Sequence, residues 1–132
     1  WDMHDRYFQQ FQDRHAWMFD QAASALLDDL EERGLIDDTV VIAVGEFGRT
    51  PKINGKAGRD HWHQCYSGLI AGGGLRSGQV IGASDKLANH PISRPLTPAD
   101  LFATALHQVG IGTTELTANG LTPLGTPIEE LI

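Results

Sequence analysis

The segment Thr39-Val40-Val41-Ile42-Ala43-Val44 decides the predicted fold, because it is a continuous β-branched run without polar alternation. A strand of this kind is expected to be covered on both faces, as in the centre of a parallel sheet. Upstream, apolar residues recur at three- and four-residue steps from Tyr7 to Leu30, which predicts a long helix that Asp5 caps and Gly34 ends. A long helix that leads into a buried strand predicts an α/β fold with a mostly parallel sheet.

Downstream of this strand the predicted elements are shorter. Thr97 is followed by a proline and, three residues on, by Asp100, which is the pattern of a capped helix start. Glycines that follow residue 71 close a second apolar run. The predicted elements are strands at residues 65–71 and 79–82, a loop or irregular strand at 83–96, a helix from Thr97 to Gly110, and a tail with no assigned element.

The length and charge of the chain limit what it can be. Its 132 residues are enough for one domain, or for one piece of a larger domain. A formal net charge of -7 argues against a nucleic-acid partner, because binding to a phosphate backbone depends on clustered lysine and arginine. No apolar run approaches the roughly 20 residues that span a bilayer, so no membrane partner is expected. The single cysteine, Cys65, allows no internal disulfide and is expected to pack as a small apolar residue.

A glycine-rich loop, residues 45–64, follows the predicted central strand. Ligands of open α/β sheets bind at the carboxyl ends of strands, so this loop is a candidate functional loop. Glu46 is the first acidic residue beyond the strand, and Arg49 offers a planar fork suited to a carboxylate, phosphate or sulfate. An ordinary turn with a surface ion pair explains this spacing equally well.

The end of the same loop is dense in titratable side chains, with Arg59, Asp60, His61 and His63 within five residues. Such a cluster is harder to explain as an ordinary turn. The two histidines need not both be metal ligands, and an imidazole ligand needs an acceptor such as Asp60, or a backbone carbonyl, to orient its second nitrogen. Arg59 could join a metal ion in attracting a small anion.

Asp2 and His4 are separated by one residue at the start of the chain. On an extended segment both side chains project to the same side, and a carboxylate beside an imidazole is half of a metal site. A helix cap followed by a surface histidine is the more common origin of such a pair. These two residues alone therefore do not establish a site.

Five motifs in a fixed order carry a resemblance to a known family. They resemble an uncharacterised bacterial sulfatase-like family of the alkaline phosphatase superfamily, catalogued as domain of unknown function fifteen-oh-one. The resemblance spans almost the whole chain and implies an α/β three-layer sandwich with a mostly parallel sheet, of which residues 1–132 would be the C-terminal part only. The motifs are Trp1-Asp2-Met3-His4, Gly45-Glu46-Phe47-Gly48-Arg49-Thr50-Pro51, Gly58-Arg59-Asp60-His61-Trp62, Ala71-Gly72-Gly73-Gly74 and Thr97-Pro98-Ala99-Asp100.

The resemblance also implies a metal site, in which Asp2, His4 and His61 would bind one divalent ion. The pair of residues that binds a second ion in the superfamily aligns with Glu46 and Phe47. Because phenylalanine cannot coordinate a metal, Glu46 would instead bridge to the first ion or act as an acid or base. Two imidazoles with carboxylates favour Zn or Mn over Ca, although Ca stays open.

The function implied by the resemblance is metal-dependent hydrolysis of a small phosphate or sulfate ester. Glu46, Arg49 and Arg59 would be the catalytic side chains, with the arginines stabilising the charge that develops on the ester. A nucleophile and further ligands would come from an upstream part of the same domain, so the chain alone would be inactive. An exported or periplasmic location is implied by the family only. The alternative is a degenerate, non-catalytic member that serves as a binding or structural module, which Phe47 favours.

Overall fold

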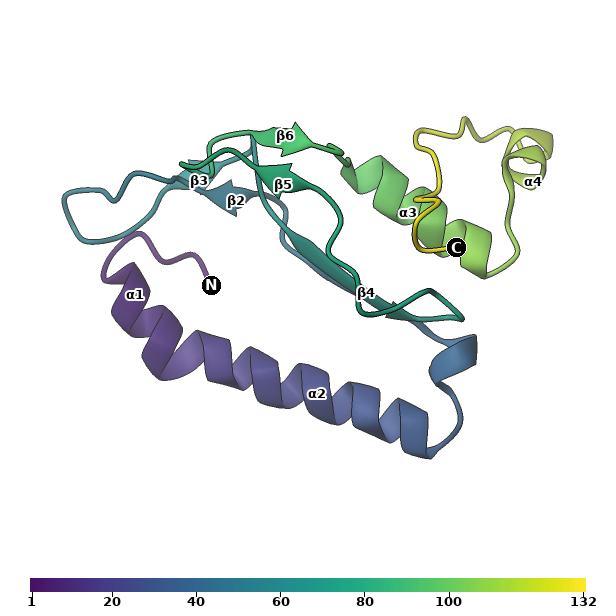
Figure 1. Cartoon of the computed structure of the whole chain (residues 1–132), viewed down its shortest axis with the longest axis horizontal. Coiled ribbons are helices and arrows are strands. Elements are labelled where there is room, and N and C mark those ends of the chain that lie inside the picture. Colours follow the sequence, from purple (N-terminus) through teal and green to yellow (C-terminus); the bar gives the residue numbers. More distant parts are fainter.

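The computed structural model describes residues 1–132, and a long helical segment runs along one side of it (Figure 1). This segment comprises α1 (Tyr7–Gln10), a π-helical turn (Phe11–His15) and α2 (Ala16–Glu32). The predicted helix is confirmed, as is the left-handed conformation of Gly34, whose φ is 68°. The prediction that Asp5 caps the helix is wrong, because the N-cap residue is Arg6 and makes no side-chain cap hydrogen bond.

The longest strand pair joins β1 (Val40–Val44) to β4 (Gly68–Gly72), and the two strands are antiparallel, with Ile42 opposite Ile70. All three strand pairs of the structure are antiparallel. The predicted three-layer sandwich with a mostly parallel sheet is therefore wrong. Parallel neighbours need a crossover connection, whereas residues 45–67 contain no helix and turn the chain back on itself.

Two shorter strand pairs form sheets separate from the pair of β1 and β4. The strand predicted at residues 79–82 does not form. The region predicted to be a loop or irregular strand, residues 83–96, contains a small hairpin with an irregular register. These short elements are β2 (Gly48–Arg49) with β3 (His61–Trp62), β5 (Ala83–Ser84) with β6 (Pro91–Ser93), and a 3-10 turn at Ile36–Asp38.

The C-terminal region contains α3 (Pro98–Gln108) and α4 (Thr113–Ala118), the second of which lies in the tail left unassigned from sequence. The predicted start of α3 is confirmed, because Thr97 and Asp100 form a capping box. Further along α3, the hydroxyl of Thr104 is fully buried, donates to the Asp100 carbonyl at 2.7 Å and accepts from the amide of Ile128 at 2.9 Å. This contact holds the end of the chain against α3.

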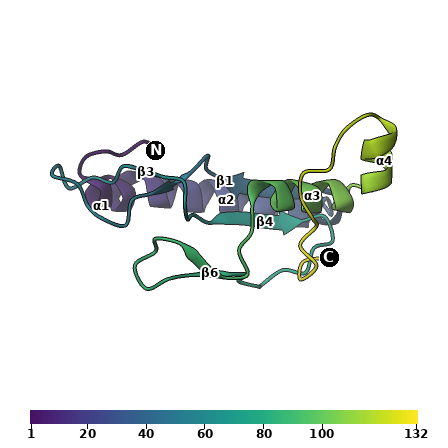
Figure 2. The same ribbon diagram turned by 90° about the horizontal axis from the view of Figure 1, so that it is seen from above.

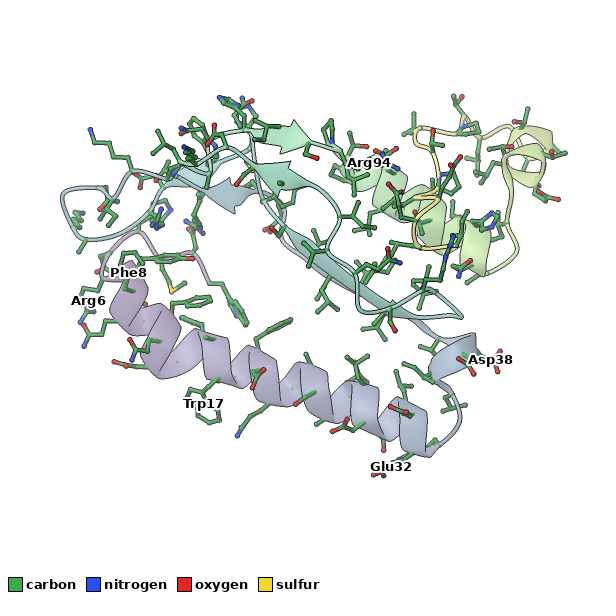
Figure 3. The ribbon with its side chains drawn as sticks, viewed as in Figure 1. Arg6, Phe8, Trp17, Glu32, Asp38 and Arg94 are labelled. Atoms are coloured by element: carbon green, nitrogen blue, oxygen red, sulfur yellow. The ribbon has the colours of Figure 1, made fainter.

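The chain encloses very little core of its own. Only five of its 132 residues are buried, and its accessible surface is 9227 Å². A folded monomer of its 14.4 kDa mass is expected to expose about 6,800 Å². The elements lie in a thin layer (Figure 2), Val44 of β1 is 49% exposed, and Trp17 projects from α2 away from the strands (Figure 3). None of the helices combines the length and apolar character needed to cross a bilayer.

We expect residues 1–132, prepared alone, to bind the dye anilinonaphthalene sulfonate and to unfold in a broad thermal transition. An excess of about 2,400 Å² of surface over a compact monomer leaves apolar side chains in water, where they stabilise nothing. Dye fluorescence measures the binding, and calorimetry measures the width of the thermal transition. Size-exclusion chromatography establishes the oligomeric state. A sharp transition of a monomer that does not bind the dye would contradict the expectation.

Candidate metal centre

The first residues of the chain lie beside the loop that precedes β3. The amide of Arg6 donates to the carbonyl of Lys56 at 3.0 Å, and the amide of Tyr7 donates to Ala57 at 2.9 Å. A third contact runs the other way, from the amide of Arg59 to the carbonyl of Met3, at 3.3 Å. Backbone contacts therefore bring the N-terminal segment to the loop, although more than 40 residues separate them in sequence.

Three side chains converge where these segments meet. The Oδ1 atom of Asp2 lies 3.0 Å from Nε2 of His4 and 2.9 Å from Nε2 of His61. The two imidazole nitrogens are 3.2 Å apart. Asp2, His4 and His61 thus present three ligand atoms in a nearly equilateral triangle, and the structure contains no other such group of three.

The size of this triangle fits a divalent ion. Zinc binds nitrogen and oxygen ligands at about 2.0–2.2 Å, so neighbouring ligand atoms lie about 2.8–3.1 Å apart at right angles and about 3.3–3.6 Å apart in a tetrahedron. The observed separations of 2.9–3.2 Å fall within or between these ranges. The side chains of Asp2, His4 and His61 are 64%, 42% and 49% exposed, so solvent and a small ligand can reach them. Asp2, His4 and His61 therefore form a possible metal-binding group.

Asp60 orients one of the two imidazoles. Its Oδ1 atom lies 2.7 Å from Nδ1 of His4. Because a carboxylate only accepts hydrogen bonds, Nδ1 carries the proton in this assignment, and Nε2 of a neutral ring keeps its lone pair. The sequence singled out Asp60 as an orienting acceptor, but its partner is His4 and not His61. This is the arrangement in which a carboxylate fixes the tautomer of a metal-binding histidine.

Both carboxylates of the site are ionised at neutral pH. The hydrogen bond to His61, and then the one to Arg49, hold the pKa of Asp2 far below its ordinary value. Hydrogen bonds to His4, and then to Asn54, lower the pKa of Asp60 in the same way. The site therefore carries two negative charges that face the imidazole rings.

The two arginines predicted to be catalytic are engaged with the protein. Arg49 donates to Oδ1 of Asp2 at 2.5 Å and is 17% exposed. Arg59 donates to the carbonyls of Thr50 and Pro51 at 2.6 and 2.8 Å, and its guanidinium lies over the rings of two aromatic residues of α1. These contacts hold the loop in place, and a role of either arginine toward a substrate stays a prediction.

Two other residues of the predicted site lie outside the triangle. Glu46 is exposed in the connection between β1 and β2 and is not part of the metal-binding group, so its role as ligand, acid or base stays a prediction. Phe47 packs its ring against that of His61, with centroids 4.1 Å apart. Phe47 thus forms an apolar wall beside His61.

Two residues of the loop were missed by the sequence reasoning. Gly58 is buried, and a Cβ placed on it would lie 1.9 Å from the carbonyl oxygen of His4. Asn54 donates to that same carbonyl at 3.0 Å. In the sequence, Gly58 stood out only as part of a motif, and the Asn54-Gly55 pair is typical of an ordinary turn. The contact of either residue with His4 could therefore not be predicted from the sequence.

One family model matches this chain, over residues 1–129, and its description is "Protein of unknown function (DUF1501)". No curated protein and no solved structure matches. The resemblance to a sulfatase-like family of the alkaline phosphatase superfamily is corrected by this result, because the description of the matching family names neither a sulfatase nor a phosphatase. Because the match covers nearly all of its 132 residues, the chain belongs to the family of proteins of unknown function DUF1501.

Proposed function

We propose that Asp2, His4 and His61 bind one divalent metal ion and that the resulting centre serves the hydrolysis of a small anionic ester. The observation that carries the proposal is the triangle of ligand atoms 2.9–3.2 Å apart, contributed by the N-terminal segment and β3. An Nε2 atom of His4 that carries no proton cannot donate to Asp2. Two acceptors that face each other at 3.0 Å repel unless a cation or a proton lies between them.

The donor atoms favour a transition metal. Two imidazole nitrogens with one carboxylate oxygen suit Zn or Mn better than Ca, which prefers six to eight oxygen ligands. Three protein ligands also leave coordination positions open, as in catalytic rather than structural zinc sites. The expected order of affinity is therefore Zn, then Mn, then Ca.

A bound divalent ion would supply Lewis-acid polarisation of a phosphate or sulfate ester oxygen. The chain's own residues contribute position and charge. Asp60 keeps Nε2 of His4 directed at Asp2. Arg49 donates a hydrogen bond to the Asp2 carboxylate and places a positive charge beside the site. A small anion that approached the ion would therefore meet Arg49 rather than an uncompensated carboxylate.

The exposed apolar surface bears on whether the site is complete. It supports the proposal that further protein packs against this chain, which the sequence reasoning expected to be an upstream part of the same domain. Groups from the upstream part would then add further metal ligands to Asp2, His4 and His61. For this reason metal binding and turnover are best measured on the full-length gene product.

The test is a titration of the chelator-treated protein with Zn²⁺, Mn²⁺ and Ca²⁺ by isothermal calorimetry, followed by assays with 4-nitrophenyl phosphate and 4-nitrophenyl sulfate. We expect saturable binding that removal of Asp2 weakens, and ester cleavage that depends on the ion. Absence of saturable binding of any of the three ions would refute the metal centre.

A non-catalytic binding module is the second candidate, and Phe47 is the observation that favours it. The ring of Phe47 covers one side of His61 and offers no ligand atom for a second metal ion there. Tight metal binding without turnover of either ester in the assays above would support this candidate over the hydrolase.

A further inference from the structure

The carboxamide of Asn54 lies at the contact between the loop and the N-terminal segment. Its Nδ2 atom donates to the carbonyl of His4 at 3.0 Å and to Oδ1 of Asp60 at 3.1 Å. Its Oδ1 atom accepts from the amides of Lys56 and Gly58, both at 2.9 Å. The orientation of the carboxamide is unambiguous, because two backbone amides can only donate and two oxygens without protons can only accept.

These four hydrogen bonds divide the side chain into two halves with different partners. The Oδ1 half contacts only the backbone of the loop, which is also held by a bond from the Asn54 amide to the Gly58 carbonyl at 2.9 Å. The Nδ2 half contacts His4 and the carboxylate that orients the ring of His4. One half therefore shapes the loop, and the other joins the loop to a ligand of the candidate metal centre.

The geometry points to Asn54 as a positioning residue for the metal centre: its Nδ2 group fixes the backbone of His4 and the Asp60 carboxylate together, so that Nε2 of His4 faces the ion. This inference rests on the proposed function, since it deepens the account of the same site. Asp60 Oδ1 receives hydrogen bonds from both Asn54 and Nδ1 of His4, at 3.1 and 2.7 Å. Without the Nδ2 donor, Asp60 loses one of the two bonds that hold its carboxylate.

The substitution Asn54→Asp separates the two halves. An aspartate keeps an acceptor for the amides of Lys56 and Gly58 but has no donor for His4 and Asp60. Asn54→Ala removes both halves and is the comparison. The second oxygen of Asn54→Asp would replace Nδ2, which lies 3.1 Å from Oδ1 of Asp60, so repulsion between the two carboxylates adds to the loss of the donor. Asn54→Ala adds no charge and therefore shows the effect of losing the donor without this repulsion.

The experiment measures zinc affinity by chelator competition on the full-length protein, and the ring N–H of His4 by proton–nitrogen NMR, assigned with His4→Gln. We expect Asn54→Asp and Asn54→Ala each to lose about 10- to 100-fold in zinc affinity, the usual effect of removing a group that orients a metal ligand. We also expect the downfield ring signal of the His4–Asp60 hydrogen bond to shift or disappear in both variants.

The outcomes separate this inference from the proposed function. If Asn54→Asp keeps the zinc affinity of the wild type, or leaves the His4 ring N–H signal unchanged, Asn54 is not a positioning residue. Its hydrogen bonds would then only stabilise the backbone of the loop. If the wild-type protein binds none of Zn²⁺, Mn²⁺ and Ca²⁺, the proposed function fails instead. The role of Asn54 is then decided by the ring signal alone, which requires no metal.

Discussion

Replacing His61 by alanine is expected to lower zinc affinity by more than about 100-fold, because groups that only orient metal ligands are already worth about 10- to 100-fold. His61 supplies one of three ligand atoms and is the member of the triangle that comes from β3. Without it, only Asp2 and His4 remain, and both belong to one short segment. Chelator competition on the full-length protein measures the affinity.

His63 provides a matched control for this substitution. It is a histidine two residues further along the chain, is exposed, and contacts only the side chain of Gln64 among the hydrogen-bonding groups. His63→Ala removes the same chemical group from the same region and should leave zinc affinity unchanged. Equal losses for His61→Ala and His63→Ala would show that the triangle is not the binding site.

The substitution Gly58→Ala is expected to have a comparably large effect, although it removes no ligand. The added Cβ would lie 1.9 Å from the His4 carbonyl oxygen and 2.5 Å from the amide nitrogen of Asp5. Both are backbone atoms, which cannot move aside as the end of a flexible side chain can. The N-terminal segment must therefore separate from the loop, and we expect zinc affinity to fall by more than about 100-fold with the displacement of His4.

Gly55→Ala is the control for this clash. Gly55 lies in the same loop, but a Cβ at this position meets nothing within 4 Å. Hydrogen exchange of the Arg6 and Tyr7 amides, which donate to the loop, reports directly on whether the two segments separate. Fast exchange in Gly58→Ala with slow exchange in Gly55→Ala is the expected result. Slow exchange of the Arg6 and Tyr7 amides in Gly58→Ala would contradict the expected separation of the N-terminal segment from the loop.

The direction of strand pairing could not be predicted from the apolar run at residues 39–44. Such a run indicates that a strand is covered on both faces, but it does not specify which strand lies beside it. In the structure the partner of β1 is β4, and the connection between them turns back without a crossover helix. Ile42 of this strand is 38% exposed, so the coverage that the pattern predicts is not provided within these 132 residues.

For the candidate site, too, the sequence indicated the chemistry of the residues better than their arrangement in space. The chemistry of Asp2, His4 and His61 was recognisable from sequence, and the structure places their ligand atoms within 4.8 Å of one another. The expected membership of Glu46 in the group rested on the family resemblance and on its position at the end of a strand in a predicted parallel sheet, where the ends of neighbouring strands meet. Once β1 and β4 are antiparallel, the second reason no longer applies.

Local sequence patterns predicted the long helical segment, the left-handed Gly34 and the capped start of α3, because each depends on contacts between residues about four positions apart. The strand directions and the partners of His4 depend instead on tertiary contacts. The contacts of His4 with Asp60 and His61 join residues 56 and 57 positions apart, and no local pattern encodes such a pairing. The backbone of the loop brings these residues together, with Asn54 and Gly58 at the point of contact.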